Sequence, residues 1–317
     1  MQSSYALSMF GLPVVRDLQS LADEMSLSAG LLHKLWAANH RFYHRFEVPK
    51  KGGGSRSILS PSREMKAVQA WILRNILDKA AVHEAATGFR KGRNVADNAA
   101  PHVDNPYFLC MDIEDFFPSI PYSKVYGVFR GLGYSRHVAH ILSHLCTCDG
   151  RLPQGAVTSP ALSNTVCIRF DRRIGAFVGR RNIAYTRYAD DLTFSCMSPS
   201  RLVAIMPTIR HIVQDEGFAL NTGKTRRMGP RQQCRVTGLV VSGGQAGVGR
   251  ARKRRLRAAI HRLLPGQLGP DELAAQQAHV QGWLGFVNAV DAKALAQLRS
   301  YAAALAGRHG IPDLLSP

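Results

Sequence analysis

Apolar residues recur at helical spacing near both ends of the chain. The N-terminal leucines with this spacing are Leu27, Leu31, Leu32 and Leu35. They predict helices over residues 1–46. Ser62 is a residue type favoured at a helix N-terminus, so it is expected to cap a following helix, and another helix is expected over residues 201–218. From about Gly249 onward the pattern is helical again, with Asp291 placed to cap the last helix.

Alternating or continuous apolar runs predict strands between these helices. Residues 48–61 form two short runs around three glycines, which predicts a basic hairpin. Residues 107–113 predict a buried strand, residues 184–196 a hairpin with an acidic turn, and residues 236–242 a short strand. Strands and helices do not alternate in a regular β–α–β rhythm. The pattern therefore favours the α+β class.

The net charge of the chain indicates what kind of molecule it binds. The 317 residues include 41 Lys+Arg and 22 Asp+Glu, a net charge of +19. Such a chain is expected to bind a polyanion, either nucleic acid or an acidic membrane. No apolar run approaches the ~18 residues that span a bilayer, and the N-terminus lacks the basic region of a signal peptide. We therefore expect a cytoplasmic protein that binds no membrane and has six reduced cysteines.

Three aspartates are the strongest candidates for chemistry. Asp190 and Asp191 lie at the predicted hairpin tip, and Asp112 lies near the end of the predicted strand. Clustered carboxylates are costly unless a cation compensates them, and Mg²⁺ suits an all-oxygen site. Ordinary turn chemistry is the alternative explanation of the adjacent pair, since Asp is favoured in turns. The flanking Tyr188 and the apolar residues that follow the pair favour the metal site.

Several motifs resemble those of reverse transcriptases in order and spacing, over nearly the whole chain. They are FLCMDIEDFF at 108–117, LPQGAVTSPALSN at 152–164, YADD at 188–191 and LNTGKT at 220–225. Two more segments, NAAPH at 98–102 and VTG at 236–238, resemble signatures of bacterial retron reverse transcriptases. The resemblance implies a right-hand polymerase with fingers, a palm built on an antiparallel sheet, and a helical thumb.

The resemblance also implies domain boundaries. The expected regions are N-terminal helices at 1–46, fingers at 47–107 and partly at 120–165, palm at 108–119 and 166–243, and thumb at 244–317.

By the same resemblance, the catalytic residues are Asp112, Asp190, Asp191 and Lys224. The aspartates are expected to hold two Mg²⁺ ions, with the carbonyl of Ile113 as a further oxygen ligand. Lys224 matches a lysine proposed to give a proton to the leaving pyrophosphate. The alternative is an ordinary exposed lysine at a glycine turn.

Nucleotide contacts are implied on two segments. Lys50 and Arg56 lie on the basic hairpin and are expected to bind the triphosphate, Arg56 through its bidentate guanidinium. A solvated surface charge is the alternative for Arg56. Gln154 matches a glutamine that packs against the incoming nucleotide, and Gly155 permits close approach of the backbone.

Phe117 occupies the sugar-gate position, five residues after Asp112. A flat ring under the sugar leaves no room for a 2′-OH, so dNTPs are the expected substrates and an RNA-dependent RNA polymerase is disfavoured. For the neighbouring Phe116, ordinary core packing is expected.

RNA contacts are expected on three segments. Asn98 and His102 are expected to fix a loop or to touch RNA, and His102 is not expected to be catalytic or a metal ligand. The other expected contacts are Val236, Thr237, Gly238, Arg250, Arg252, Lys253, Arg254 and Arg255. Leu256 and Ile260 share one face of the arginine-rich helix, which places its basic residues on the exposed side.

One further cluster has alternatives. His140, His144, Cys146 and Cys148 offer zinc-ligand chemistry. Their tight spacing and the surrounding apolar residues favour a buried helix end instead.

The resemblance implies that the enzyme primes from and copies a structured noncoding RNA into branched DNA–RNA, in defence against phage. The expected partners are that RNA, its DNA product, dNTPs, an effector protein and a separate RNase H activity. The alternatives are a reverse transcriptase of a group II intron, a diversity-generating element or a CRISPR system, and a non-catalytic RNA-binding scaffold.

Overall fold

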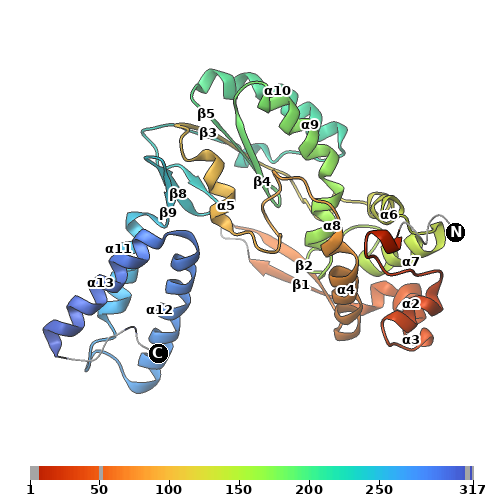
Figure 1. The fold of residues 1–317 in the computed structure, drawn as a ribbon, viewed down its shortest axis with the longest axis horizontal. Helices are drawn as coiled ribbons and strands as arrows, with labels where there is room; N and C mark the ends of the chain where they lie inside the picture. Colours follow the sequence, from red (N-terminus) through yellow and green to blue (C-terminus); the bar gives the residue numbers. More distant parts are fainter. Residues whose placement is uncertain (1–6, 50–52, 311–314, 316–317) are drawn as a thin grey trace.

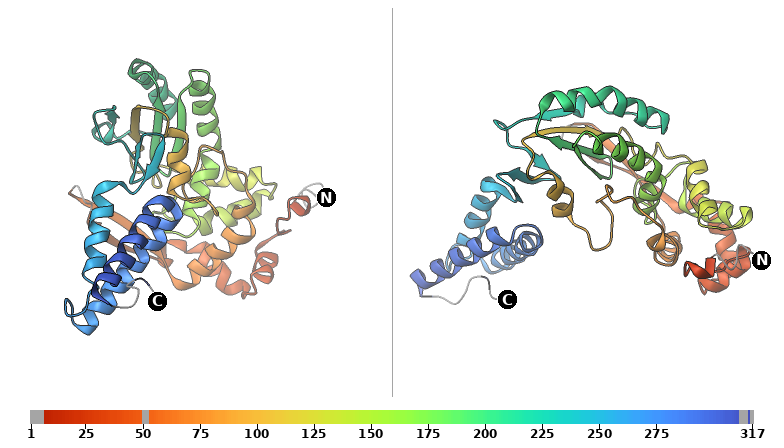
Figure 2. Two further views of the ribbon diagram at one scale, coloured as in Figure 1. Left: turned by 60° about the vertical axis from the view of Figure 1, so that its left-hand side comes forward. Right: turned by 45° about the horizontal axis from the view of Figure 1, so that its top comes forward.

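The computed structural model describes residues 7–49, 53–310 and 315. A sheet with its covering helices lies between an N-terminal helical region and a C-terminal helical bundle, and together they form an arch (Figures 1 and 2). The first helices are α2 (Leu18–Glu24), α3 (Ala29–Ala37), α4 (Arg63–Asn75), α5 (Val95–Ala99), α6 (Tyr122–Gly131) and α7 (Arg136–Cys146). The later helices are α8 (Ser159–Val166), α9 (Ile168–Gly179), α10 (Pro199–Asp215), α11 (Gly249–His261), α12 (Pro270–Val290) and α13 (Ala292–His309).

The central sheet is antiparallel and has the order β4–β5–β3–β6. Its strands are β3 (Tyr107–Asp112), β4 (Ala184–Tyr188), β5 (Asp191–Cys196) and β6 (Arg226–Met228). Helices α9 and α10 pack against the sheet (Figure 1). This mixture of helices with an antiparallel sheet confirms the α+β class and fits the right-hand polymerase.

The basic hairpin is longer than predicted. It consists of β1 (Tyr43–Pro49) and β2 (Ser55–Pro61), and Tyr43 pairs with Pro61. The prediction of helix up to residue 46 is therefore wrong for its last four residues, because their pairing with β2 overrides the helical pattern. The Ser62 side chain accepts a hydrogen bond from the Met65 N–H at 3.3 Å, which confirms the predicted cap of α4.

The strand predicted over 236–242 is instead part of a small three-stranded sheet. It contains β7 (Arg235–Val236), β8 (Leu239–Ser242) and β9 (Gln245–Gly247). Thr237 and Gly238 form the turn between β7 and β8, with φ of 45° and 83°. Two successive residues with positive φ are typical of tight hairpin turns.

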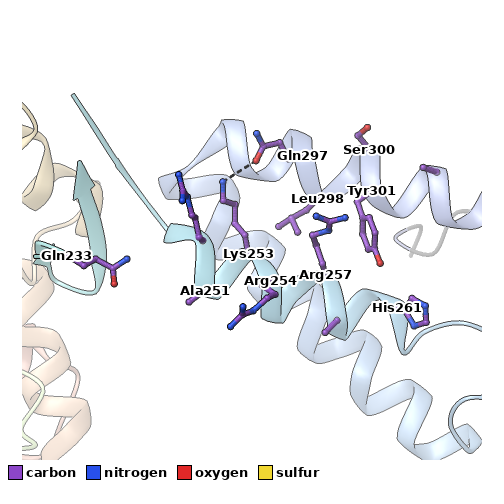
Figure 3. A pocket seen from close by; sticks show the side chains of 13 residues that line it. Gln233, Ala251, Lys253, Arg254, Arg257, His261, Gln297, Leu298, Ser300 and Tyr301 are labelled. Carbon is purple, nitrogen blue, oxygen red and sulfur yellow. Dashed lines mark hydrogen bonds between the residues drawn. The ribbon is translucent and has the colours of Figure 1, made fainter. Parts of the chain in front are cut away.

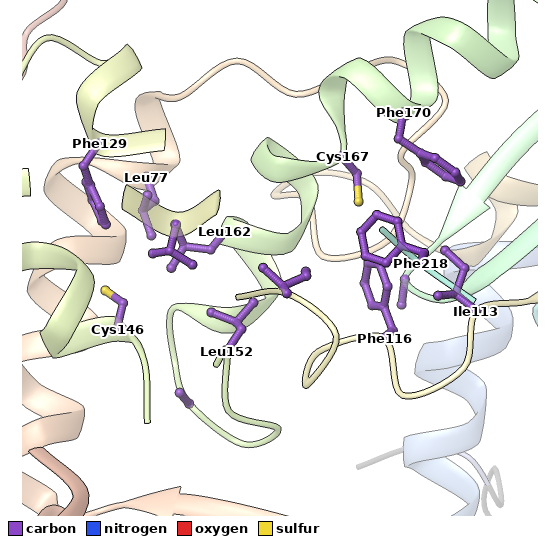
Figure 4. Close-up of a cluster of buried hydrophobic side chains, with 14 of the residues drawn as sticks. Leu77, Ile113, Phe116, Phe129, Cys146, Leu152, Leu162, Cys167, Phe170 and Phe218 are labelled. Carbon is purple, nitrogen blue, oxygen red and sulfur yellow. The ribbon is translucent and has the colours of Figure 1, made fainter. Parts of the chain in front are cut away.

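The described residues form three hydrophobic cores, of which the smallest lies around the β7–β8–β9 sheet. The main core runs from the N-terminal helices to the sheet, and Figure 4 shows Phe116, Phe170 and Phe218 packed together within it. A separate core joins α11, α12 and α13. Asp291 accepts hydrogen bonds from the N–H of Ala294 at 2.9 Å and of Val248 at 3.0 Å. It therefore caps α13, as predicted, and also ties that helix to the start of α11.

Candidate active site

The three predicted carboxylates come together at one end of the central sheet. Asp112, the last residue of β3, is the register partner of Asp191, the first residue of β5. Asp190 lies in the turn before Asp191, and its carbonyl accepts a hydrogen bond from the Ile113 N–H at 3.0 Å. A carboxylate oxygen of each aspartate lies within 4.8 Å of those of the other two. The fold thus builds a compact site in which every side-chain ligand is oxygen.

The environment of this site disfavours negative charge in the absence of a cation. Burial raises the pKa of Asp190, and the nearby Asp112 carboxylate raises it further. Loss of hydration and the two neighbouring carboxylates raise the pKa of Asp191 to about 6. Divalent cations favour such a set of hard oxygen ligands and relieve its repulsion. The residues present therefore fit a metal, while the carbonyl of Ile113 stays a predicted ligand.

Lys224 lies directly beside the carboxylates. Its Nζ donates hydrogen bonds to both carboxylate oxygens of Asp112, at 2.8 and 3.0 Å. This hydrogen bonding raises the pKa of Lys224 and keeps it protonated. A cavity of about 290 Å³ opens between Lys224, Asp112 and Asp191. The lysine thus presents a proton donor at the edge of the carboxylate cluster.

A buried ionic network lies behind the turn between β4 and β5, the predicted catalytic turn, and was missed by sequence reasoning. Tyr188 pairs with Asp191, so Ala189 and Asp190 form a two-residue turn, with Ala189 at φ 56°. Arg187 donates to the Ala189 carbonyl at 3.2 Å and to both carboxylate oxygens of Asp171, at 2.8 and 2.6 Å. The available signal was an arginine as the one charged residue of a predicted strand, where a buried charge requires a partner.

Asn164 extends this network to a loop before α5. Its amide nitrogen donates to the Gly88 carbonyl at 2.8 Å, and its side-chain oxygen accepts from Arg187 at 3.2 Å. A Cβ atom on Gly88 would lie 3.1 Å from the Ala189 backbone nitrogen. The absence of a side chain therefore allows the loop to pack directly on the catalytic turn.

The segment with Gln154 and Gly155 packs against the basic hairpin. The Gln154 carbonyl accepts a hydrogen bond from the Leu59 N–H at 2.9 Å. Gly155 has φ 130°, and a Cβ there would lie 2.7 Å from the Leu59 carbonyl oxygen. The close backbone approach predicted for Gly155 is therefore made to the hairpin. The positive charge of Arg56, on this hairpin, offsets a small part of the rise in the pKa of Asp190 that burial and Asp112 cause. Lys50 lies outside the described residues.

The two adjacent phenylalanines differ in burial. Phe116 is 3% exposed and belongs to the main core, as predicted. Phe117 is half-buried and lies at the edge of that core, with its ring centroid 5.4 Å from that of Phe116. Its proposed contact with the sugar stays a prediction.

Asn98 and His102 have structural partners, and their burial does not fit the expected RNA contacts. Asn98 is 1% exposed and accepts a hydrogen bond from the Thr87 hydroxyl at 2.6 Å. His102 is fully buried, between the hydroxyl groups of Ser195 at 2.7 Å and Thr186 at 2.8 Å. Burial lowers the pKa of His102 to about 4. Both residues therefore fix the α5 segment against its neighbours.

The three residues expected to contact RNA at the VTG segment are placed differently from one another. Val236 is 1% exposed and belongs to the small core beneath β8, so its side chain does not fit the expected contact. Thr237 is half-buried and its hydroxyl accepts from Asn98 at 3.3 Å. Gly238 is exposed, and no other atom lies within 4 Å of the place where a Cβ would be. Glycine is therefore favoured here by the positive φ of the turn and not by close packing of another segment.

Helix α11 presents a basic groove toward α13, of about 1160 Å³ (Figure 3). The groove is lined by Arg250, Lys253, Arg254, Arg257 and His261 together with polar residues of α13. Arg257 lies over the Tyr301 ring at 4.3 Å. Arg257 and His261 were missed by sequence reasoning, although they continue the face of Lys253 at intervals of four residues.

Two predicted basic residues of α11 lie on different sides of the helix. Arg255 is exposed, as expected. Arg252 is half-buried, and its guanidinium lies over the Trp283 ring at 4.9 Å. The expectation that Arg252 lies on the exposed side is wrong. Arg252 precedes the buried Leu256 by four residues, so both side chains lie on the inward face of α11.

The histidine–cysteine segment forms no metal cluster within the described residues; only the three aspartates gather in that way. The rings of His140 and His144 lie 4.5 Å apart, and Nδ1 of His140 bonds the Tyr122 hydroxyl at 2.7 Å. Burial raises the pKa of Cys146 to about 12, so it stays a thiol. All six cysteines are free, as predicted.

The comparisons with known proteins agree with this geometry. Residues 48–241 match the family model described as reverse transcriptase (RNA-dependent DNA polymerase). The chain is 40% identical to the retron Ec86 reverse transcriptase of Escherichia coli, over 97% of this chain and 95% of that protein. It is 37% identical to the retron Mx65 reverse transcriptase of Myxococcus xanthus, over 92% of this chain and 73% of that protein.

Among the described residues, no helix has the length and apolar character required to cross a membrane.

The family match spans more than half of the chain and includes every carboxylate of the site. The chain therefore belongs to the reverse transcriptase family, as an RNA-directed DNA polymerase of the retron type.

Proposed function

We propose that this reverse transcriptase starts DNA synthesis from its own structured noncoding RNA and copies part of that RNA into a branched DNA–RNA product. The observation that supports the catalytic part is the cluster of Asp112, Asp190 and Asp191, with carboxylate oxygens within 4.8 Å of one another. The similarity to retron enzymes along almost the whole chain supports the self-priming part.

The three aspartates are the proposed ligands of two Mg²⁺ ions, with the Ile113 carbonyl as a further oxygen ligand. When bound, the ions supply positive charge to the attacking and leaving oxygens of an in-line phosphoryl transfer. Lys224, held protonated beside Asp112, is placed to give its proton to the leaving pyrophosphate.

The proposed nucleotide contacts lie around these carboxylates. Arg56, whose charge acts on Asp190, binds the triphosphate together with Lys50. Gln154 packs against the nucleotide, while Gly155 keeps this segment joined to the hairpin. Phe117 lies under the sugar and excludes a 2′-OH, which makes dNTPs the substrates.

The proposed RNA-binding surface is the exposed part of α11, near the turn at Gly238. Its members are the exposed Arg250, Arg254 and Arg255 together with the half-buried Lys253, which also donates a hydrogen bond to Gln297 at 3.2 Å. We propose that they bind backbone phosphates of the folded RNA. The proposal places the reaction in the cytoplasm, where six free thiols stay reduced. An effector protein in phage defence and an RNase H activity supplied in trans complete the proposed partners.

The test is co-expression of the enzyme with the structured RNA encoded beside its gene, followed by a search for RNA-linked DNA. Wild-type protein is expected to give a short DNA joined to RNA through a 2′–5′ branch, without an added primer. The matched control is Asp190→Asn, which is expected to give none. Equal copying of any primed RNA, with no branched product, would contradict the self-priming proposal and leave a general reverse transcriptase.

A further inference from the structure

Phe89 has a conformation and an exposure that are unusual for its residue type. Its φ is 59°, and its side chain is 43% exposed despite being large and apolar. A bulky residue with positive φ is rare, and it persists where the surrounding structure holds it in place. Phe89 lies in the loop before α5, directly after the glycine that packs on the catalytic turn.

Hydrogen bonds hold this loop on both sides of Phe89. Before it, the Thr87 N–H donates to the Arg187 carbonyl at 2.9 Å, and the Gly88 carbonyl accepts from Asn164 at 2.8 Å. After it, the Arg90 guanidinium donates back to the Ala86 carbonyl at 3.2 Å. Phe89 is therefore presented by a braced loop that is anchored to the catalytic turn.

The Phe89 ring lies between two rings of the active site. Its centroid is 6.1 Å from that of Phe117 and 6.1 Å from that of Tyr188. Both distances are within the range in which aromatic pairs attract each other. Phe117 thus contacts the buried Phe116 ring on the core side and the exposed Phe89 ring on the solvent side.

We propose that Phe89 is a positioning residue for sugar selection, acting through Phe117. The inference rests on the proposed function, in which Phe117 is the sugar gate. A half-buried ring supported only from the core can rotate or shift, and such a shift makes room for a 2′-OH. The exposed contact from Phe89 keeps the ring in the excluding position. Loss of Phe89 relaxes the choice between dNTP and NTP without disturbing the carboxylates.

The experiment measures kcat/KM for a dNTP and the corresponding NTP on one primed RNA template. Phe117→Ala is expected to remove most of the preference for the dNTP. Phe89→Ala is expected to lower that preference by about tenfold, through a lower KM for the NTP, with kcat for the dNTP nearly unchanged. Phe89→Tyr, which keeps the ring, and Phe10→Ala, which removes an exposed ring distant in sequence, are expected to retain wild-type selectivity.

Phe89→Gly separates selectivity from stability. Glycine adopts positive φ without strain, so this variant is expected to melt no lower than Phe89→Ala while losing the same selectivity. If Phe117→Ala relaxes the preference for the dNTP but Phe89→Ala and Phe89→Gly do not, Phe89 does not position Phe117. The assignment of Phe117 as the sugar gate is then unaffected. If Phe117→Ala also keeps its preference for the dNTP, both the gate and the inference built on it are wrong.

Discussion

The guanidinium of Arg187 and the carboxylate of Asp171 form an ion pair of 2.6 Å in which both side chains are fully buried. The hydroxyl of Tyr185 donates a further hydrogen bond to Asp171 at 2.8 Å. Because Arg187 also bonds the Ala189 carbonyl, the pair fixes the turn that carries Asp190. The position of Asp190 in the carboxylate cluster therefore depends on a charge network that lies outside the cluster.

Asp171→Asn should be strongly destabilising, because it leaves the Arg187 charge buried without its partner. The expected loss is about 3–5 kcal/mol in the free energy of unfolding, measured in urea. The matched control is Asp215→Asn, which breaks the partly exposed pair with Arg173 and should cost at most about 1 kcal/mol. Equal losses in the two variants would contradict the structural role of the buried pair.

His102 should make the protein sensitive to acid. Its pKa is lowered to about 4 by burial, so between about pH 6.5 and pH 4 the unfolded chain binds a proton that the folded protein does not. The contribution of His102 to the free energy of unfolding is fully present above pH 6.5. It falls as the pH decreases toward 4, by up to about 1.4 kcal/mol per pH unit. His102→Gln should be less stable at pH 7 and should lack this part of the slope. The exposed His279→Gln is the control, and it should keep the slope.

The clustering of the three aspartates could be predicted from the sequence because their signal is local. Asp112 closes an apolar strand, and Asp190 and Asp191 occupy a hairpin tip whose register puts the carboxylates together. The partners of His102 follow no local pattern, since Thr186 and Ser195 lie 84 and 93 residues away. Only the folded chain shows that this histidine and Asn98 are buried.

Lys224→Met should lower the rate of nucleotide incorporation by about 10²–10⁴-fold, the usual range for loss of a general acid. The hydrogen bonds that Lys224 donates to the Asp112 carboxylate raise the pKa of Lys224, so the proton is present throughout neutral and mildly alkaline pH. The measurement is single-turnover incorporation on a primed RNA. Lys224→Arg keeps a positive donor and should retain more activity. A rate for Lys224→Met within twofold of wild type would show that Lys224 is an ordinary exposed lysine.

RNA affinity should fall steeply with salt, because binding releases counterions from the phosphates. Replacing both Arg254 and Arg255 with Ala should reduce the slope of log K against log[salt] by about 2, one for each lost phosphate contact. Arg252→Ala is the matched control on the same helix. Because Arg252 packs on Trp283, this variant should lower thermal stability and leave the slope nearly unchanged. An unchanged slope in the double variant would remove α11 from the RNA-binding surface.

The different roles of these arginines could not be predicted from composition. Six of the eight residues from Arg250 to Arg257 are basic, so every face of that helix includes a positive charge. The packing partners decide which charges are available, and Trp283 lies 31 residues beyond Arg252. The Thr237–Gly238 turn divides the strand that was predicted over residues 236–242, because the apolar residues on both sides of the turn are also consistent with one continuous strand.

The aspartate cluster is proposed to catalyse DNA synthesis on RNA with a divalent metal ion. The most direct test is dNTP incorporation on a primed RNA by purified wild type, Asp112→Asn and Asp190→Asn, with Mg²⁺ and with excess chelator. Wild type should extend the primer only with Mg²⁺. Each variant should lose several kcal/mol of transition-state stabilisation, a rate loss of about 10³-fold or more, while binding RNA with wild-type affinity. Extension by either variant at the wild-type rate, or by wild type in chelator, would contradict the account.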